Sequence, residues 1–166
     1  MPKAIIFSDL HLGIKESLLH YQAKAMYRMQ DYAEGEGIHI FFCCGDVFHT
    51  PGRLTDKTIN TAREIFRKCW SRKYYCLVGN HDYNSSGLNF GVDTLIPNSL
   101  ECIEDLVSVI NSSSAVAPFE GTICKMIPYT ENYDYLKRML ERNSNDYLFL
   151  HQGVSGHPIG SDFVGS

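Results

Sequence analysis

An α/β fold is predicted by short apolar segments that alternate with longer segments of helical periodicity. Residues 3–7, 38–44 and 74–78 are apolar runs without polar alternation, as expected of strands covered on both faces of a sheet. Residues 16–34 and 55–70 lie between them and carry apolar side chains at helical spacing. Open α/β folds bind their ligands beyond the ends of such strands, so the residues that follow each run are the candidates for function.

The second half of the chain has a different pattern. Short β-type runs separated by turn residues predict a second sheet or a meander over residues 100–127. Residues 83–99 form a long loop or a weak helix beside the candidate site, and residues 154–166 form a loop. The β-type runs are Cys102–Ile103, Leu106–Ile110, Ala115–Ala117 and Thr122–Ile127, and they are followed by a helix over 132–141 and a strand over 147–150.

The composition is that of one globular domain, which we expect to extend over residues 1–166. Hydrophobic residues make up 44% and charged residues 20% of the 166. No apolar run approaches the roughly 18 residues that span a bilayer, and none at the N-terminus resembles a signal peptide, so a cytoplasmic protein is expected. Six cysteines without Cys-x-x-Cys spacing indicate neither a zinc finger nor a disulfide framework. The net charge of −4 gives no support for bulk attraction to nucleic acid.

Four predicted strands end in side chains that can bind a metal. Each motif alone is common in loops, but their occurrence at four strand ends in the same chain predicts a metal site. The candidate ligands are Asp9 and His11 after the first strand, Asp46 after the second, Asn80 after the third and His151 after the last, with His49, His81 and Asp82 nearby in the sequence.

The mixed oxygen and nitrogen ligand set suits Mn²⁺, Fe²⁺ or Zn²⁺ better than Ca²⁺. Asp46 has two oxygens and could bridge two cations. Two ions about 3.5–4 Å apart would hold a hydroxide and clamp a phosphate group between them. His81 would then protonate the leaving oxygen, with Asp82 orienting its ring. The residues therefore predict metal-assisted phosphoester hydrolysis.

Over nearly the whole chain, these ordered motifs resemble those of the calcineurin-like metallophosphoesterase superfamily. The matching segments are Asp9-x-His11, Gly45-Asp46-x-x-His49, Gly79-Asn80-His81-Asp82 and His151. The resemblance implies a two-sheet β-sandwich flanked by helices, with two divalent metals at the strand ends. It further implies that Asp9, His11 and Asp46 hold one ion, and that Asp46, Asn80 and His151 hold the other.

Within the superfamily, the segments 8–13, 45–49 and 150–154 are similar to the nuclease subunits of SbcCD (Mre/Rad) double-strand-break repair complexes. That resemblance implies a Mn²⁺-dependent DNA exonuclease and endonuclease, with Fe²⁺, Zn²⁺ or Mg²⁺ as alternative metals. It implies an SMC-like ATPase partner, a possible homodimer, and catalytic roles for His49 and His81. Serine/threonine phosphatases carry Asp-Arg-Gly where this chain has Phe48-His49-Thr50, which disfavours that branch.

One departure from the superfamily pattern is the lack of its final Gly-His-x-His motif. Gly156-His157 matches only the first half, and His157 is a weak substitute ligand. We expect residues 1–166 to be the N-terminal part of a longer catalytic domain or a truncated copy, also lacking the DNA-capping and ATPase-binding segments. Two alternatives stay open. They are a phosphoesterase for small substrates, suggested by the acidic charge, and a non-catalytic domain, suggested by the missing motif.

Overall fold

The computed structural model describes residues 2–49, 53–68, 72–83, 97–141, 145–152, 158–159 and 163–164. A four-stranded parallel sheet has the order β1-β2-β3-β4, and a three-stranded sheet has the order β5-β6-β7. The strands are β1 (Ala4–Phe7), β2 (Ile40–Cys43), β3 (Lys73–Leu77), β4 (Ser108–Ile110), β5 (Ser114–Phe119), β6 (Thr122–Ile127), β7 (Tyr147–Leu150) and the antiparallel pair β8 (Pro158–Ile159) and β9 (Phe163–Val164). The helices are η1 (Glu16–Leu18), α1 (Leu19–Gly35), α2 (Asp56–Arg67), η2 (Ser99–Ile103) and α3 (Tyr133–Glu141).

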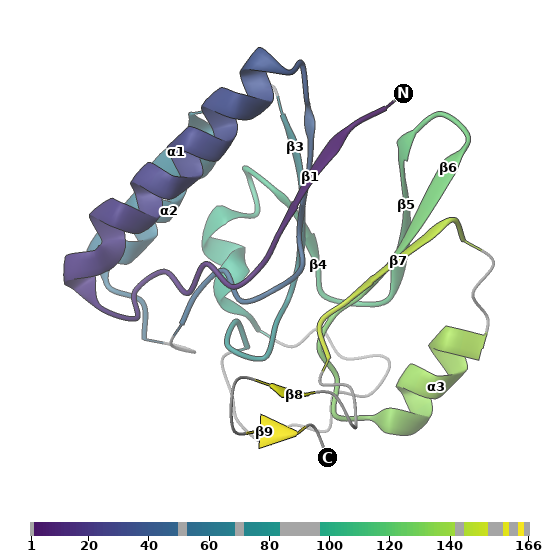
Figure 1. The fold of residues 1–166 in the computed structure, drawn as a ribbon. Helices are drawn as coiled ribbons and strands as arrows, with labels where there is room; N and C mark the ends of the chain where they lie inside the picture. Colours follow the sequence, from purple (N-terminus) through teal and green to yellow (C-terminus); the bar gives the residue numbers. More distant parts are fainter. Residues whose placement is uncertain are drawn as a thin grey trace.

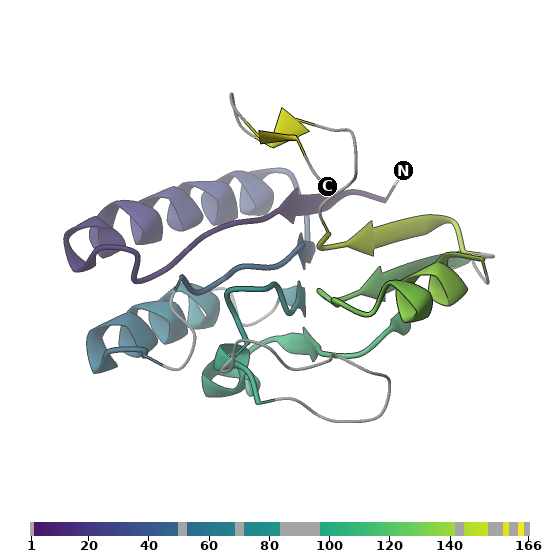
Figure 2. The same ribbon diagram turned by 90° about the horizontal axis from the view of Figure 1, so that it is seen from below.

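The elements stack in layers. Helices α1 and α2 lie side by side against one face of the first sheet, and the second sheet lies beyond the other face (Figures 1 and 2). Helix α3 lies on the far side of the second sheet, where Lys125 Nζ of β6 donates a hydrogen bond to the Met139 carbonyl at 2.9 Å. The expected sandwich of two sheets flanked by helices is confirmed.

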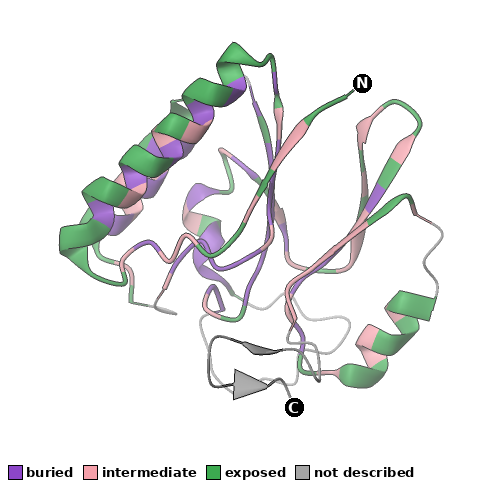
Figure 3. Cartoon of the chain, in the orientation of Figure 1, coloured by how far each residue is buried: buried purple, intermediate pink, exposed green. Residues whose placement is uncertain are grey.

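Both faces of the first sheet are buried because its central strands β2 and β3 carry apolar or aromatic side chains at every position except Lys73, at the start of β3. Phe41 and Tyr74 pack toward the helices, where they join the larger hydrophobic core. Phe42 and Tyr75 point to the opposite face and join the core between the sheets. The Phe42 ring stacks on Phe149 of β7, with centroids 4.5 Å apart. Helices α1 and α2 show the complementary pattern, with buried residues on the side next to the sheet and exposed residues on the outer side (Figure 3).

The prediction of a second sheet over residues 100–127 is only half right. The run Cys102–Ile103 belongs to the 3₁₀ helix η2, because Asn98 caps its start. The Asn98 side chain accepts a hydrogen bond from Leu100 N, and the Glu101 side chain accepts one from Asn98 N. Strand β4 extends the first sheet beside β3, so only β5 and β6 of this region join the second sheet.

Some predictions fall on residues outside the described ranges. These are most of the predicted loop over 83–99, the end of the second predicted helix, and His157. The predicted loop over 154–166 contains the two short strands β8 and β9. Among the described residues, no helix combines the length and the apolar character that crossing a membrane requires.

Parallel pairing explains why distant segments meet. Strands β1, β2 and β3 run in the same direction, so the segments that begin at Ser8, Cys44 and Val78 leave the sheet at one edge. Strand β7 reaches the same place from the second sheet and ends immediately before His151.

We predict that Phe42→Ala lowers the free energy of unfolding by about 3–5 kcal/mol, because it empties the contact between the two sheets. Urea denaturation followed by circular dichroism measures the change. Tyr21→Ala is the matched control, since Tyr21 is 67% exposed on α1, and it should change stability by less than about 0.5 kcal/mol. Equal effects of the two substitutions would show that the sheets do not share a packed core.

Candidate metal centre

The segments that follow β1 and β2 run beside each other and are joined through their backbones. Asp9 N donates to the Gly45 carbonyl at 3.1 Å, and His11 N donates to the Asp46 carbonyl at 3.0 Å. Asp9, His11 and Asp46 have φ angles of +58°, +45° and +55°. Two residues apart on an extended strand, Asp9 and His11 would point to the same side, and a common direction is therefore expected from their spacing; the backbone here is not extended, so that reason is wrong. Their side chains converge through left-handed conformations, each costing about 1 kcal/mol or more for a residue with a Cβ.

The Asp46 carboxylate lies at the centre of the cluster. Its Oδ2 is 3.8 Å from His11 Nε2 and 3.5 Å from His151 Nε2, and its Oδ1 accepts a hydrogen bond from His81 N at 3.0 Å. Asp9 Oδ1 stands 3.6 Å from His11 Nε2 on the outer side. Burial opposes the charge on Asp46, but the contacts with His151 and the His81 amide outweigh it and lower the pKa of the carboxyl group. Asp46 is therefore an ionised carboxylate held between two imidazoles.

His151 is oriented by a backbone carbonyl. Its Nδ1 lies 2.7 Å from the Cys44 carbonyl oxygen, which can only accept, so Nδ1 carries the proton. Its Nε2 is then directed at Asn80 Oδ1, 3.0 Å away, and at Asp46. Burial lowers the pKa of His151, yet the contacts with Asp46 and with the Cys44 carbonyl outweigh burial and raise it. Three electron-pair donors thus face one point, which is an arrangement that a cation satisfies.

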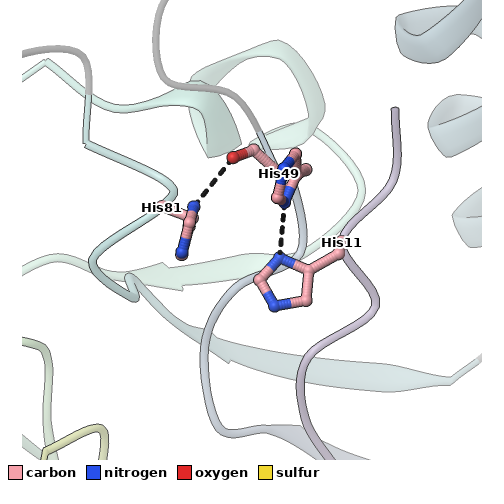
Figure 4. A group of neighbouring side chains, drawn as sticks. All are labelled: His11, His49 and His81. Atoms are coloured by element: carbon pink, nitrogen blue, oxygen red, sulfur yellow. Dashed lines mark hydrogen bonds between the residues drawn. The ribbon is translucent and has the colours of Figure 1, made fainter. Parts of the chain in front are cut away.

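Three histidines form one wall of the site (Figure 4). The Nδ1 atoms of His11 and His49 are 3.3 Å apart, and the rings of His49 and His81 stack with centroids 5.2 Å apart. His81 Nδ1 donates to the His49 carbonyl at 2.8 Å, which leaves Nε2 as the ring atom available for chemistry. Burial and the neighbouring imidazoles of His11 and His81 lower the pKa of His49.

Asp82 does not contact the His81 ring, and this corrects the orienting role expected for it. Its carboxylate accepts hydrogen bonds from three backbone amides, at 2.9 Å from Phe48 N, 2.9 Å from Gly79 N and 3.3 Å from Val47 N. Burial raises the pKa of this carboxyl group to about 6, although the amide donors oppose the rise. The side chain ties the segment after β2 to the segment after β3.

Two glycines leave room for the charged side chains. A Cβ on Gly45, which has a φ of +108°, would lie 2.8 Å from the Cγ of His151. A Cβ on Gly79 would lie 2.9 Å from the Cγ of Asp46. Both distances are closer than side chains pack, so these positions require glycine for the approach of the ligands.

The five predicted ligands come together. Asp9, His11 and Asp46 present ligand atoms within 4.8 Å of one another. His151 Nε2 lies 3.5 Å from Asp46 Oδ2 and 3.0 Å from Asn80 Oδ1, which connects the other two predicted ligands to this group. The carboxylates, imidazoles and amide oxygen fit divalent metal ions. His11, His49 and His81 also lie within 4.8 Å of one another.

Sequence reasoning missed Gln22. This side chain of α1 donates from Nε2 to the carbonyls of Leu10 and His11, at 2.8 and 3.0 Å. A glutamine within a helix carries no sequence signal for such a contact. The Cys44 carbonyl that orients His151 was missed for the same reason, since any residue offers a carbonyl.

The calcineurin-like phosphoesterase family model matches residues 2–162, and the chain belongs to that family, whose members are hydrolases that use divalent metals. The resemblance inferred from the sequence motifs is confirmed.

A relative is similar over most of the chain. It is Exonuclease subunit 1 of Enterobacteria phage T4, which is 23% identical over 180 residues. The match includes 98% of this chain and 51% of the phage protein. The chain therefore spans about half the length of this relative.

We predict that Gly79→Ala lowers the free energy of unfolding by about 2 kcal/mol and weakens Mn²⁺ binding, because the new methyl group displaces the Asp46 carboxylate. Calorimetric Mn²⁺ titration and thermal unfolding measure the two effects. Gly35→Ala is the control. Gly35 ends α1 with no atom within 4 Å of an added Cβ, so this variant should be neutral or up to about 1 kcal/mol more stable. Unchanged Mn²⁺ affinity in Gly79→Ala would contradict the described position of Asp46.

Proposed function

We propose that this protein hydrolyses phosphodiester bonds in DNA with the help of two divalent metal ions. The observation that carries the proposal is the shared position of Asp46, whose Oδ2 lies between the Nε2 atoms of His11 and His151. A carboxylate placed between two sets of ligands is what a dinuclear site requires.

Asp9, His11 and Asp46 would hold one ion, and Asp46, Asn80 and His151 would hold the other. Bound there, the ions would act as Lewis acids toward a phosphate oxygen and would acidify a water molecule. The mixture of carboxylate, imidazole and amide ligands suits Mn²⁺, Fe²⁺ or Zn²⁺. The resemblance to double-strand-break repair nucleases supports Mn²⁺ among these, with Mg²⁺ as a further alternative.

His81 is the proposed proton donor to the leaving oxygen. Its Nδ1–H is engaged by the His49 carbonyl, so a proton carried on Nε2 is the one it can transfer.

His49 has a different environment. If His11 binds a metal through Nε2, its Nδ1–H points at His49 Nδ1, and His49 then offers its own Nε2–H to a substrate oxygen. His81 is thus the acid, and His49 is a neutral hydrogen-bond donor.

DNA is the proposed substrate class on two grounds. The motifs are similar to those of double-strand-break repair nucleases, and the phage relative is named as an exonuclease subunit. The same resemblance supports an SMC-like ATPase partner and a homodimer. Co-purification with such an ATPase and light scattering of the purified chain test these two proposals.

Hydrolysis of a small phosphoester is the second candidate. The net charge is −4, and several cationic side chains are already paired with carboxylates, including Lys57 with Glu16 at 2.7 Å and Lys68 with Asp31 at 2.8 Å. Paired cations offer less charge to a DNA backbone. Turnover of p-nitrophenyl phosphate esters without any cleavage of DNA would favour this candidate.

The decisive experiment measures Mn²⁺-dependent cleavage of linear and single-stranded DNA by the chain and by His81→Gln. We predict that the substitution lowers the rate by about 10²–10⁴-fold, because the leaving oxygen loses its proton donor. Mn²⁺ affinity should stay close to that of the unsubstituted chain, since His81 is not a proposed ligand.

His20→Gln is the control, because His20 is exposed on α1 and lies outside the site. It should retain full activity. A chain that binds Mn²⁺ but leaves DNA intact would overturn the nuclease proposal. Full activity of His81→Gln would overturn the assignment of the acid.

A further inference from the structure

The loop that carries Asp9 and His11 is held on two sides. On one side, the amides of Asp9, His11 and Leu12 donate to carbonyls of residues 45–47, at 3.1, 3.0 and 2.8 Å. On the other side, the carbonyls of Leu10 and His11 face helix α1 and accept hydrogen bonds from Gln22. Gln22 therefore supports the backbone of a proposed metal ligand and of the residue before it.

We propose that Gln22 is a positioning residue of the metal centre, which fixes the loop so that Asp9 and His11 present their side chains together. This inference rests on the proposed function, because it takes Asp9 and His11 as metal ligands. The hydrogen bonds that Gln22 donates go to backbone carbonyls, so it acts on these side chains through the backbone of the loop.

The orientation of the Gln22 amide follows from its partners. Both partners are backbone carbonyls, which only accept, so the amide nitrogen must face them and donate one hydrogen bond to each. The other amide atom, Oε1, is buried without a hydrogen-bond partner in the described structure. Leaving a buried acceptor unpaired is unfavourable, so Gln22 is kept at this position although its Oε1 lowers stability.

The loop needs this support because its conformation is unfavourable by itself. The φ angles of Asp9 and His11 are +58° and +45°, a region that residues with a Cβ seldom occupy. Such conformations persist where the surrounding contacts over-determine them. The Asp9 side chain is 56% exposed, accepts a hydrogen bond from Ser8 Oγ and lies 3.6 Å from His11 Nε2. Its position therefore depends in part on the adjoining backbone of Leu10 and His11, which Gln22 holds.

Gln30 provides a matched comparison on the same helix. It is buried, its Nε2 donates to the Ile65 carbonyl at 2.9 Å and to the Tyr74 hydroxyl at 2.8 Å, and its Oε1 also lacks a partner in the described structure. Its hydrogen bonds join α1 to α2 and β3, and not to the loop that carries Asp9 and His11. Gln30 therefore has the same chemistry as Gln22 without the link to the site.

The experiment compares Gln22→Met with Gln30→Met, because methionine keeps the length of glutamine and removes the donors. Calorimetric titration with Mn²⁺ should show a dissociation constant about tenfold or more higher for Gln22→Met, the size expected when support of a metal ligand is lost. Gln30→Met should lose stability but keep its Mn²⁺ affinity. Hydrogen exchange of the Asp9, His11 and Leu12 amides, recorded without metal, should accelerate selectively in Gln22→Met.

The possible results separate this inference from the proposed function. If the unsubstituted chain does not bind Mn²⁺, the proposed function fails, and the exchange rates alone decide whether Gln22 holds the loop. If the unsubstituted chain binds Mn²⁺ and Gln22→Met binds it equally well, the inference is overturned. Equal acceleration of loop exchange in both variants would also overturn it, because Gln22 would then be a general packing residue.

Discussion

The site depends on the carboxylate of Asp82, which joins the segments that follow β2 and β3. Three backbone amides, two from Val47 and Phe48 and one from Gly79, donate to this buried side chain. These hydrogen bonds fix the segment that carries Asp46 against the segment that carries Asn80 and His81. Removing the carboxylate would leave buried donors without partners, at a cost of about 1–3 kcal/mol for each. Asp82 therefore has a structural role within the candidate metal centre.

Around this link, the topology gathers ligands from both sheets. Parallel pairing of β1, β2 and β3 delivers Asp9, His11, Asp46 and Asn80 to one edge. His151 directly follows β7 of the second sheet, and its hydrogen bond to the Cys44 carbonyl orients its ring toward Asp46. A metal bound between these groups would therefore tie the two sheets together, so metal binding and the stability of the sandwich should be linked.

The sequence was sufficient to predict the fold class and the meeting of the candidate ligands at one place, because buried strands and polar strand ends leave clear patterns. It was insufficient where the outcome depended on tertiary hydrogen bonds. Asp82 was expected to orient the His81 ring because the two residues are adjacent. Its hydrogen-bond partners are instead backbone amides, which have no sequence signature. The run Cys102–Ile103 has strand-like composition, but the capping contacts of Asn98 and Glu101 set a helix there. The left-handed conformations of Asp9 and His11 were likewise invisible in residue types.

The proposed function depends on Asp46 being shared between two metal positions. Electron paramagnetic resonance of the chain titrated with Mn²⁺ at low temperature detects whether two ions are bound next to each other. We expect two bound ions whose spins are coupled, and loss of the coupling in Asp46→Ala. Two independent Mn²⁺ signals, or a coupled signal that survives Asp46→Ala, would contradict it.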